Sequence, residues 1–427
     1  MDVLAVIAIA VFAHGLVSGR LRSTIVTGPM VFVAVGLATG PEALDLAAVE
    51  LESEQVIILA ELTLAIVLFS DAVRVDPSMI RRFVGIPART LGIGLPMVIG
   101  AGTLVARAVL DLPWAEAALL ASILAATDAA LGQAVLTDES VPSRVRGSLN
   151  VESGLNDGLA LPAVTLFVAL LTAEASDEGA SFWVRFVAEQ VGYGVVAGVA
   201  IGGGGGWLLV TLRRRGWVEG ISGQLAALAL VGMGYVLAHE IGGNAFIAAF
   251  VTGLTFRIVG DEDAEHLTEF SEDAGQLAAS ITFVVFGNAL LGPALDDLTL
   301  ALAIWVLAAL TVVRMVPIAL SLVGTGLRAP TVAFLGWFGP RGLASILFAL
   351  TVLEDTGRGV QDDLFTTVAW TVVASVVLHG ATAGWGARRY GRWYEQHRAG
   401  AHPDASMAEG AMDDDTPSPR VRSAPRY

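Results

Sequence analysis

Long apolar runs separated by short polar stretches make up this chain from its start to about residue 390. About 20 apolar residues in a helix cross a bilayer core roughly 30 Å thick, and most of these runs approach or exceed that length. The pattern predicts an all-α polytopic membrane protein. The thirteen predicted transmembrane helices are residues 2–19, 24–40, 54–73, 86–108, 113–136, 148–172, 182–212, 221–239, 242–258, 270–292, 298–326, 329–353 and 364–387.

The positions of arginine between the predicted spans test this count. Arginines are concentrated in the loops after odd-numbered spans, whereas the loops after spans 2 and 6 are acidic and contain none. Cytoplasmic loops carry an excess of basic residues, so we expect an external N-terminus and a cytoplasmic C-terminus in the plasma membrane. The clusters are Arg20 and Arg22, Arg74 to Arg82, Arg144 and Arg146, Arg213 to Arg215, and Arg388 to Arg398; the exceptions are Arg107, Arg185 and Arg358.

Composition agrees with a membrane protein and excludes several other classes. The chain has 427 residues, of which 55% are hydrophobic and 15% charged, whereas soluble domains have about 25% charged residues. The absence of cysteine excludes disulfides, thiolate metal sites and cysteine nucleophiles. All 25 basic residues are arginine, and 41 acidic residues give a net charge of −16, which disfavours nucleic acid as a partner. A halophilic organism and a GC-rich genome would each favour this composition.

Four polar side chains lie close together in span 6, within the stretch Gly147–Gly158. Residues four apart share a helical face, which pairs Glu152 with Asn156 and Ser153 with Asp157. At about 1.5 Å per residue, Asp157 lies about 15 Å into the span, near the middle of the bilayer. Ionisable groups at this depth are energetically unfavourable and are usually functional, so the stretch predicts a cation or proton site.

Two other spans contain residues that disfavour a continuous helix. Thr127 and Asp128 interrupt span 5, and the sequence Gly-Pro-Arg-Gly at 339–342 interrupts span 12. Proline lacks a backbone donor, and glycine tolerates extended backbone. We therefore expect spans 5 and 12 to be a crossed pair of broken helices at the membrane midplane. In that arrangement Asp128 and Arg341 would neutralise helix ends of opposite charge.

Thirteen spans also suggest two inverted six-helix repeats joined by span 7. Residues 261–273 are predicted to be an acidic cytoplasmic linker and surface helix. The final residues are rich in proline, alanine, serine and aspartate, as in disordered tails. The predicted divisions are a membrane domain at 1–390, consisting of a first repeat at 1–172, a linker helix at 182–212 and a second repeat at 221–390, followed by a cytoplasmic tail at 391–427.

These features resemble the monovalent cation/proton antiporter superfamily, and in particular its electroneutral sodium/proton exchanger branch. The resemblance covers about residues 1–390, and the absence of lysine agrees with it, because the electrogenic branch has a membrane lysine. Gly154 departs from the usual spelling of the span 6 motif. The resemblance rests on Thr127-Asp128, Glu152-Ser153, Asn156-Asp157-Gly158, Arg314, and the segments 242–254, 283–290 and 339–342.

The resemblance implies a role for each matched residue. Asp157 matches the carboxylate that binds both the cation and the proton. Asp128 and Ser153 match its co-ligands, and Thr127 matches the residue that contributes a backbone carbonyl. These four residues would bind Na⁺, and no cofactor is implied beyond the transported Na⁺ and H⁺.

Supporting residues are implied as well. Glu152 and Arg314 match a buried ion pair near the site, and Arg341 would support the break in span 12. Asn156 occupies the place of the first aspartate of an Asp-Asp pair in electrogenic relatives. We expect Asn156 to lie beside Glu152, facing Arg314.

The predicted function is secondary active antiport of Na⁺ or Li⁺ for H⁺ by alternating access, with both ions competing for one aspartate. Because Asn156 cannot carry a second proton, we expect electroneutral 1:1 exchange. The resemblance also implies a homodimer in the lipid bilayer. Three alternatives stay open: a K⁺/H⁺ antiporter of the same fold, an intramembrane aspartyl hydrolase that uses Asp128 and Asp157, and a channel.

Overall fold

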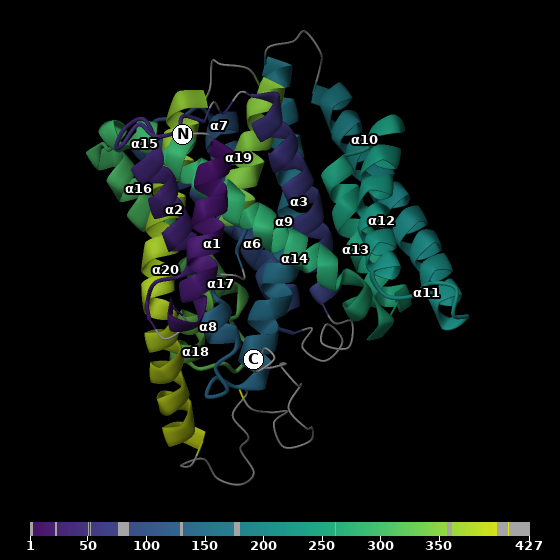
Figure 1. Ribbon diagram of the computed structural model, residues 1–427. Coiled ribbons are helices and arrows are strands. Elements are labelled where there is room, and N and C mark those ends of the chain that lie inside the picture. Colours follow the sequence, from purple (N-terminus) through teal and green to yellow (C-terminus); the bar gives the residue numbers. More distant parts are fainter. Residues whose placement is uncertain are drawn as a thin grey trace.

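The computed structural model describes residues 3–21, 24–49, 51, 53–75, 85–128, 131–174, 180–260, 262–356, 361–398 and 409. In these residues the regular structure is entirely helical, which confirms the predicted all-α class (Figure 1). The helices of the first half are α1 (Val3–Leu21), α2 (Gly28–Thr39), α3 (Glu54–Arg74), α5 (Pro87–Arg89), η1 (Thr90–Gly94), α6 (Leu95–Val109), α7 (Trp114–Ile123), α8 (Gln133–Leu136) and α9 (Ser143–Glu174).

A long helical segment with a π-helical middle, η2, follows in the position predicted for the linker. The second half then continues in helices up to Arg398. Its elements are α10 (Ala180–Gly198), η2 (Val199–Gly205), α11 (Gly206–Arg214), α12 (Ile221–Glu240), α13 (Ala245–Gly260), α14 (Glu262–Val285), η3 (Phe286–Leu291), α15 (Gly292–Ala294), η4 (Leu295–Asp297), α16 (Leu300–Leu310), α17 (Val312–Ser321), α18 (Ala329–Trp337), α19 (Leu343–Thr356) and α20 (Gln361–Arg398).

Helices occur wherever the hydrophobic pattern predicts a span. Nine helical segments in the described part of the chain are long and apolar enough to cross a membrane, which supports a multi-pass membrane protein. Four shorter apolar helices, α2, α7, α13 and part of α19, lie at the other predicted spans. How many of them cross the bilayer, and whether the halves are inverted repeats, stays a prediction.

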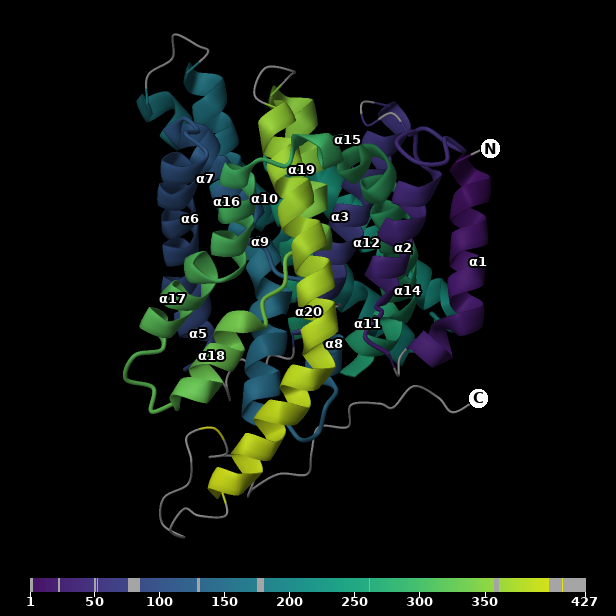
Figure 2. The ribbon, with the colours of Figure 1, turned by 90° about the vertical axis from the view of Figure 1, so that its left-hand side faces the viewer.

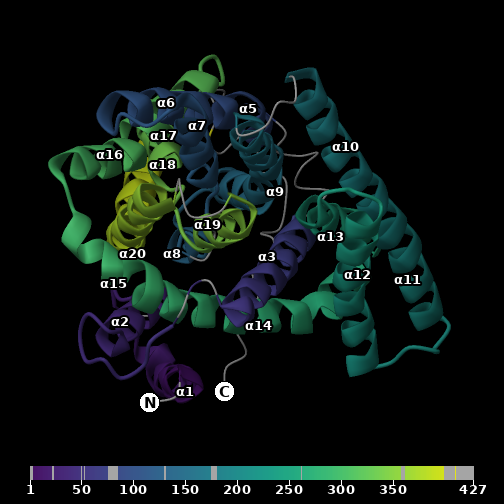
Figure 3. The same ribbon diagram turned by 90° about the horizontal axis from the view of Figure 1, so that it is seen from above.

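Seen from above, the helices form two groups (Figure 3). One group contains α6, α7, α9 and α16 to α20, and the other contains α1, α2 and α10 to α14. Helix α3 lies between them, because it packs against α13 and α14 on one side and against α9 and α19 on the other. The two groups therefore meet along α3 and α9.

The predicted interruptions of spans 5 and 12 are present as ends of helices. Helix α7 ends at Ile123 and α8 begins at Gln133, while α18 ends at Trp337 and α19 begins at Leu343. The two non-helical segments touch each other, since the Asp128 amide donates a hydrogen bond of 2.8 Å to the Pro340 carbonyl. Helix α20 packs against both α18 and α19 and so passes beside the second break (Figure 2).

The acidic stretch differs from the prediction. Instead of a separate linker, residues from Glu262 onward belong to α14, which continues into the apolar segment of span 10. Apolar and acidic residues can share one helix here because arginines of neighbouring helices pair with its acidic side chains. The pairs are Asp263 with Arg214 at 3.0 Å, Glu265 with Arg257 at 3.3 Å and Glu272 with Arg74 at 3.3 Å.

The predicted tail lies almost entirely outside the described residues. Helix α20 ends at Arg398, within the range 391–427 that the sequence assigns to the tail. Beyond it, only Glu409 is described, and its carboxylate accepts a hydrogen bond of 2.8 Å from the amide of Arg328 at the start of α18.

Candidate functional site

Helix α9 holds the break in span 5 through the three polar atoms of Thr127. The Thr127 amide donates to Oδ1 of Asp157 at 3.1 Å, and its carbonyl accepts from the Ser153 hydroxyl at 3.0 Å. Its hydroxyl accepts from Nδ2 of Asn156 at 3.1 Å. Because α7 has already ended, these backbone groups lack helical partners, and α9 supplies them. The interrupted backbone is thereby fixed against the polar stretch of span 6.

The expectation that Asn156 faces Arg314 is wrong. Its amide nitrogen donates to the Ala125 carbonyl at 3.1 Å as well as to Thr127. The backbone carbonyls after the end of α7 have no helical donors, and the amide nitrogen of Asn156 supplies one to Ala125. The other amide atom, Oδ1, is buried and has no hydrogen-bond partner in the described part of the chain.

Glu152 and Arg314 form a buried ion pair. Their side chains are 4% exposed, and Nη2 of Arg314 lies 2.5 Å from Oε1 of Glu152. Arg314, and not Arg341, is therefore the hydrogen-bonded partner of Glu152. A Cβ atom on Gly339 would lie 1.9 Å from the Arg314 guanidinium carbon, so a side chain there would displace this arginine from its place beside the break of span 12.

Asp128 and Arg341 lie at helix ends of opposite charge. Oδ2 of Asp128 accepts a hydrogen bond of 3.0 Å from the amide of Leu343, at the N-terminus of α19. Nη1 of Arg341 donates to the carbonyls of Ala125 and Ala126, at 3.3 and 3.4 Å, just after α7 ends. The negative charge at the N-terminus of α19 and the positive charge after the C-terminus of α7 each interact favourably with the helix dipole, as the crossed arrangement predicts.

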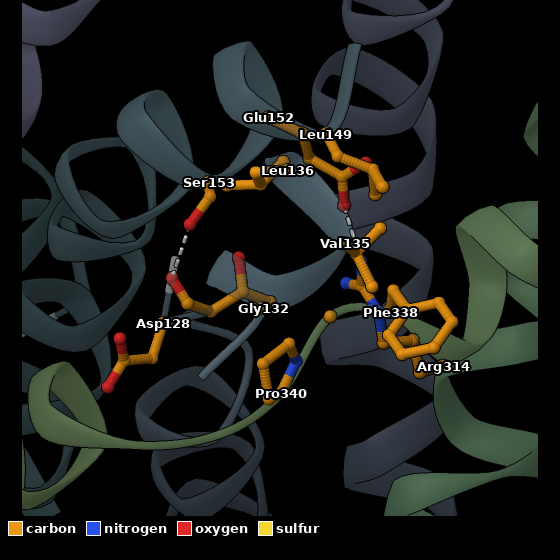
Figure 4. A pocket seen from close by; sticks show the side chains of 12 residues that line it. Asp128, Gly132, Val135, Leu136, Leu149, Glu152, Ser153, Arg314, Phe338 and Pro340 are labelled. Atoms are coloured by element: carbon orange, nitrogen blue, oxygen red, sulfur yellow. Dashed lines mark hydrogen bonds and ion pairs between the residues drawn. The ribbon is translucent and has the colours of Figure 1, made fainter. Parts of the chain in front are cut away.

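A small pocket lies between two sets of polar side chains (Figure 4). Ser153 and Asp128 lie on one side of it and the Glu152–Arg314 pair lies on the other. Its volume of about 20 Å³ is enough for roughly one water-sized occupant. Asp157 does not line the pocket but is connected to it through Thr127. The remaining wall is largely apolar and comes from Gly132, Val135, Leu136, Leu149, Phe338, Gly339 and Pro340.

The chemistry of this region suits a hard monovalent cation better than a transition metal. The available donors are carboxylate, hydroxyl and carbonyl oxygens, which hard cations prefer. Within the described residues, no three histidine, aspartate or glutamate side chains converge as they would around a transition metal.

Asp71 of α3 is a further acidic residue near the site, and it is paired with Arg74 of the same helix at 3.4 Å. Its charge acts on both Asp157 and Asp128. Gly154 explains the approach of α3, because a Cβ there would lie 2.7 Å from a methyl group of Val75 and 3.1 Å from the Asp71 carbonyl. Gly154 is also the position at which the span 6 motif departs from the family spelling.

Residues 5–388 match the transmembrane part of the sodium/hydrogen exchanger family, and the chain therefore belongs to that family. The match covers the crossed breaks, the polar stretch of α9 and Arg314. Exchangers of this kind are secondary transporters rather than enzymes.

Two relatives differ in the cation that their names give. The chain is 26% identical to the K⁺/H⁺ antiporter NhaP of Alkalimonas amylolytica over 88% of its own length and 64% of that protein. It is also 26% identical to the Na⁺/H⁺ antiporter ApNhaP of Aphanothece halophytica, over 70% of its length and 57% of that protein. The chain thus spans less than two thirds of the length of these relatives.

The fold is similar to that of a solved structure, the sodium proton antiporter MjNhaP1 from Methanocaldococcus jannaschii. The TM-score is 0.74 at 19% sequence identity, over 91% of this chain and 98% of that one. At this identity the likeness establishes the fold alone.

Proposed function

We propose that this protein exchanges a monovalent cation for protons, with the Asp157 carboxylate as the group for which the two compete. The environment of Asp157 carries this proposal. The carboxylate is buried, with 3% of the residue exposed, and its hydrogen-bond donor is the neutral amide of Thr127. In the described part of the chain no ion pair joins it to an arginine, although the charge of Arg341 attracts it. A buried carboxylate without a bound counter-charge favours the binding of a cation or a proton.

We infer that the cation binds between Asp157 and the neighbouring oxygens of Asp128, Ser153 and Thr127. The Thr127 carbonyl accepts from Ser153 and keeps a second lone pair for a ligand. The Ser153 hydroxyl donates its proton to Thr127, and the lone pairs of its oxygen are available to a cation. Asp71, which is paired with Arg74 at 3.4 Å, lies on the α3 side, and its carboxylate also acts electrostatically on Asp157.

Exchange is electroneutral in this scheme. Glu152 is neutralised by Arg314, and Asn156 has no proton to exchange. A site with one carboxylate has the same net charge whether it holds one Na⁺ or one H⁺. Exchange of the two ions therefore moves no net charge across the membrane. A sustained current after a sodium jump on reconstituted vesicles would contradict this part of the proposal.

The direct test uses proteoliposomes that contain a pH-sensitive dye. Addition of Na⁺, Li⁺ or K⁺ outside should dissipate an imposed pH gradient for the wild type and not for Asp157→Asn. Equal signals from both proteins would contradict the assignment of Asp157. The order of the three cations gives the specificity, because Na⁺ and K⁺ use the same kinds of ligand and relatives of both names match the chain.

Assembly and orientation belong to the same proposal. We infer a homodimer in the plasma membrane, an external N-terminus and a cytoplasmic C-terminus, on the basis of family resemblance and arginine placement. Accessibility labelling of single cysteines introduced into this cysteine-free chain would test the orientation, and light scattering of the purified protein would test the dimer.

A further inference from the structure

Two polar residues of α20 lie beside the break in span 12 and contact both of its ends. Nε2 of His379 lies 3.0 Å from the carbonyl of Trp337, the last residue of α18. One turn earlier on α20, the Ser375 hydroxyl oxygen accepts a hydrogen bond of 2.7 Å from the amide of Arg341. Both side chains are buried. The break from 338 to 342 is therefore bounded on each side by a contact to the same short stretch of α20.

Hydrogen-bonding capacity fixes the direction of these contacts. The Trp337 carbonyl can only accept, so Nε2 of His379 carries a proton and donates it. Ser375 already accepts from Arg341, and its own hydroxyl proton can be donated to Nδ1 of His379, which lies 3.1 Å away. If Nδ1 is protonated as well, the ring is an imidazolium cation and Nδ1 donates to the Ser375 carbonyl at 3.0 Å. The bond from Nε2 to Trp337 is the same in both cases.

The imidazole ring is also held by its face. It stacks on the indole of Trp337 with 4.8 Å between ring centroids and 27° between planes. The indole nitrogen of Trp337 donates to the Thr382 hydroxyl at 3.1 Å, so α18 and α20 share a further contact that does not involve the break. Stacking and the Thr382 bond join the two helices, whereas Ser375 and the His379 ring nitrogens bind the backbone at the break itself.

The geometry of the break determines where Asp128 lies. Pro340 accepts from the Asp128 amide at 2.8 Å, and the amide of Leu343 donates to its carboxylate at 3.0 Å. A movement of either end of the break would therefore move the Asp128 carboxylate.

We propose that Ser375 and His379 are positioning residues that fix the non-helical segment of span 12 and thereby hold Asp128 at the cation site. Neither touches the cation. The inference rests on the proposed function for its transport readout, but the conformational part can be measured without transport. The sequence alone does not predict this role for His379, because an isolated histidine in an apolar helix is usually a packing residue.

The experiment compares four variants of the full chain in proteoliposomes. His379→Phe keeps an aromatic ring beside Trp337 but loses both nitrogens, and His379→Gln retains an amide donor that can reach the carbonyl. Ser375→Ala removes one hydroxyl. Thr382→Val is the matched control, because it removes the bond to the Trp337 indole on the same two helices and leaves the break untouched.

We expect His379→Phe and Ser375→Ala each to raise the half-saturating cation concentration by about threefold to tenfold, the effect of one lost hydrogen bond, with little change in maximal rate. His379→Gln should recover most of the loss, and Thr382→Val should resemble the wild type. Unchanged half-saturation in Ser375→Ala and His379→Phe, or an equal shift in Thr382→Val, would overturn the proposal.

Hydrogen exchange of the amides of Arg341 and Leu343 supplies the second measurement. The proposal expects faster exchange in His379→Phe and Ser375→Ala than in Thr382→Val. If His379→Phe fails to fold, Ser375→Ala carries the same test with a smaller change. Wild-type vesicles without cation-dependent proton flux would contradict the proposed function, whereas unchanged amide exchange in Ser375→Ala would contradict the positioning role, so the two failures are distinguishable.

Discussion

Glu152 and Asp157 are two buried carboxylates on one helix, and their surroundings differ. Each residue is 3% exposed. Glu152 lies 2.5 Å from the guanidinium of Arg314, so its charge is compensated within the protein. Asp157 accepts from the neutral amide of Thr127 at 3.1 Å. Burial alone therefore does not distinguish a structural carboxylate from one that can take part in transport, whereas the nature of the partner does.

The two membrane arginines also differ in the kind of partner that each has. Arg314 neutralises a carboxylate, and removal of either partner would leave an isolated charge in a low-dielectric region. Arg341 donates to backbone carbonyls after α7 and supports the break by capping a helix end. In the proposed mechanism, the charge that remains for exchange is therefore that of Asp157, next to Asp128.

The largest effect is expected for Asp157→Asn. The amide keeps nearly the same volume but has no charge with which to bind a cation or exchange a proton, so exchange should fall by at least about 100-fold. Size-exclusion chromatography and thermal unfolding should show a folded protein, since a neutral side chain is easier to bury. Wild-type rates in this variant would remove Asp157 from the site.

The next largest effect is expected for Arg314→Ala, and it concerns stability. Removal of one partner of a buried pair costs about 3–5 kcal/mol, because Glu152 is left as an isolated charge. The unfolding midpoint in detergent should fall strongly. In the double variant Arg314→Ala with Glu152→Gln, part of the loss should be recovered. A double variant less stable than the single one would show that the pair is not the main source of the effect.

A moderate effect is expected for Gly342→Ala. A Cβ atom there would lie 2.2 Å from Oδ2 of Asp128, so the carboxylate or the break must move. We expect roughly a tenfold lower exchange rate, since small displacements of a reacting group have large effects on rate. Gly203→Ala is the matched control, because a Cβ at Gly203 meets no atom within 4 Å. Equal activity of the two variants would contradict the role assigned to the Asp128 position.

The smallest of these effects is expected for Asp71→Asn. Asp71 acts on Asp157 and Asp128 through its charge, and such interactions are partly screened. The half-saturating cation concentration should rise about twofold to fivefold without loss of folding. Asp263→Asn is the control, because Asp263 lies at the start of α14 and pairs with Arg214. This variant should leave the half-saturating cation concentration unchanged. An abolished activity in Asp71→Asn would instead make Asp71 a direct ligand.

The sequence was sufficient for most of the helices and for the contacts at the crossed breaks. Apolar runs predict helices because their length and period are local properties, and the proline and glycines of 339–342 mark a break for local reasons. Spacing of four residues puts Ser153 and Asp157 on one helical face, and both bond to Thr127, whereas their place beside the break in span 5 required the family resemblance. The ion pair of Glu152 with Arg314 required the family resemblance, since the two lie far apart in the sequence.

Other features depend on how the helices pack and could not be predicted from local patterns. The direction of Asn156 is set by a carbonyl after α7 that has no helical donor and belongs to a different span. The proximity of Asp71 depends on the close contact between α3 and α9 that Gly154 permits. The merging of the acidic stretch with α14 depends on arginines from other helices. Each case involves a partner distant in sequence.

The most direct test of the central claim is the release of protons when a cation binds to the purified protein. Titration of Na⁺ or K⁺ into wild-type protein in weakly buffered detergent, followed with a pH dye, should release up to about one proton per cation bound. Asp157→Asn should release none. Saturable cation binding to the wild type without proton release, or undiminished release from Asp157→Asn, would contradict competition of cation and proton for this carboxylate.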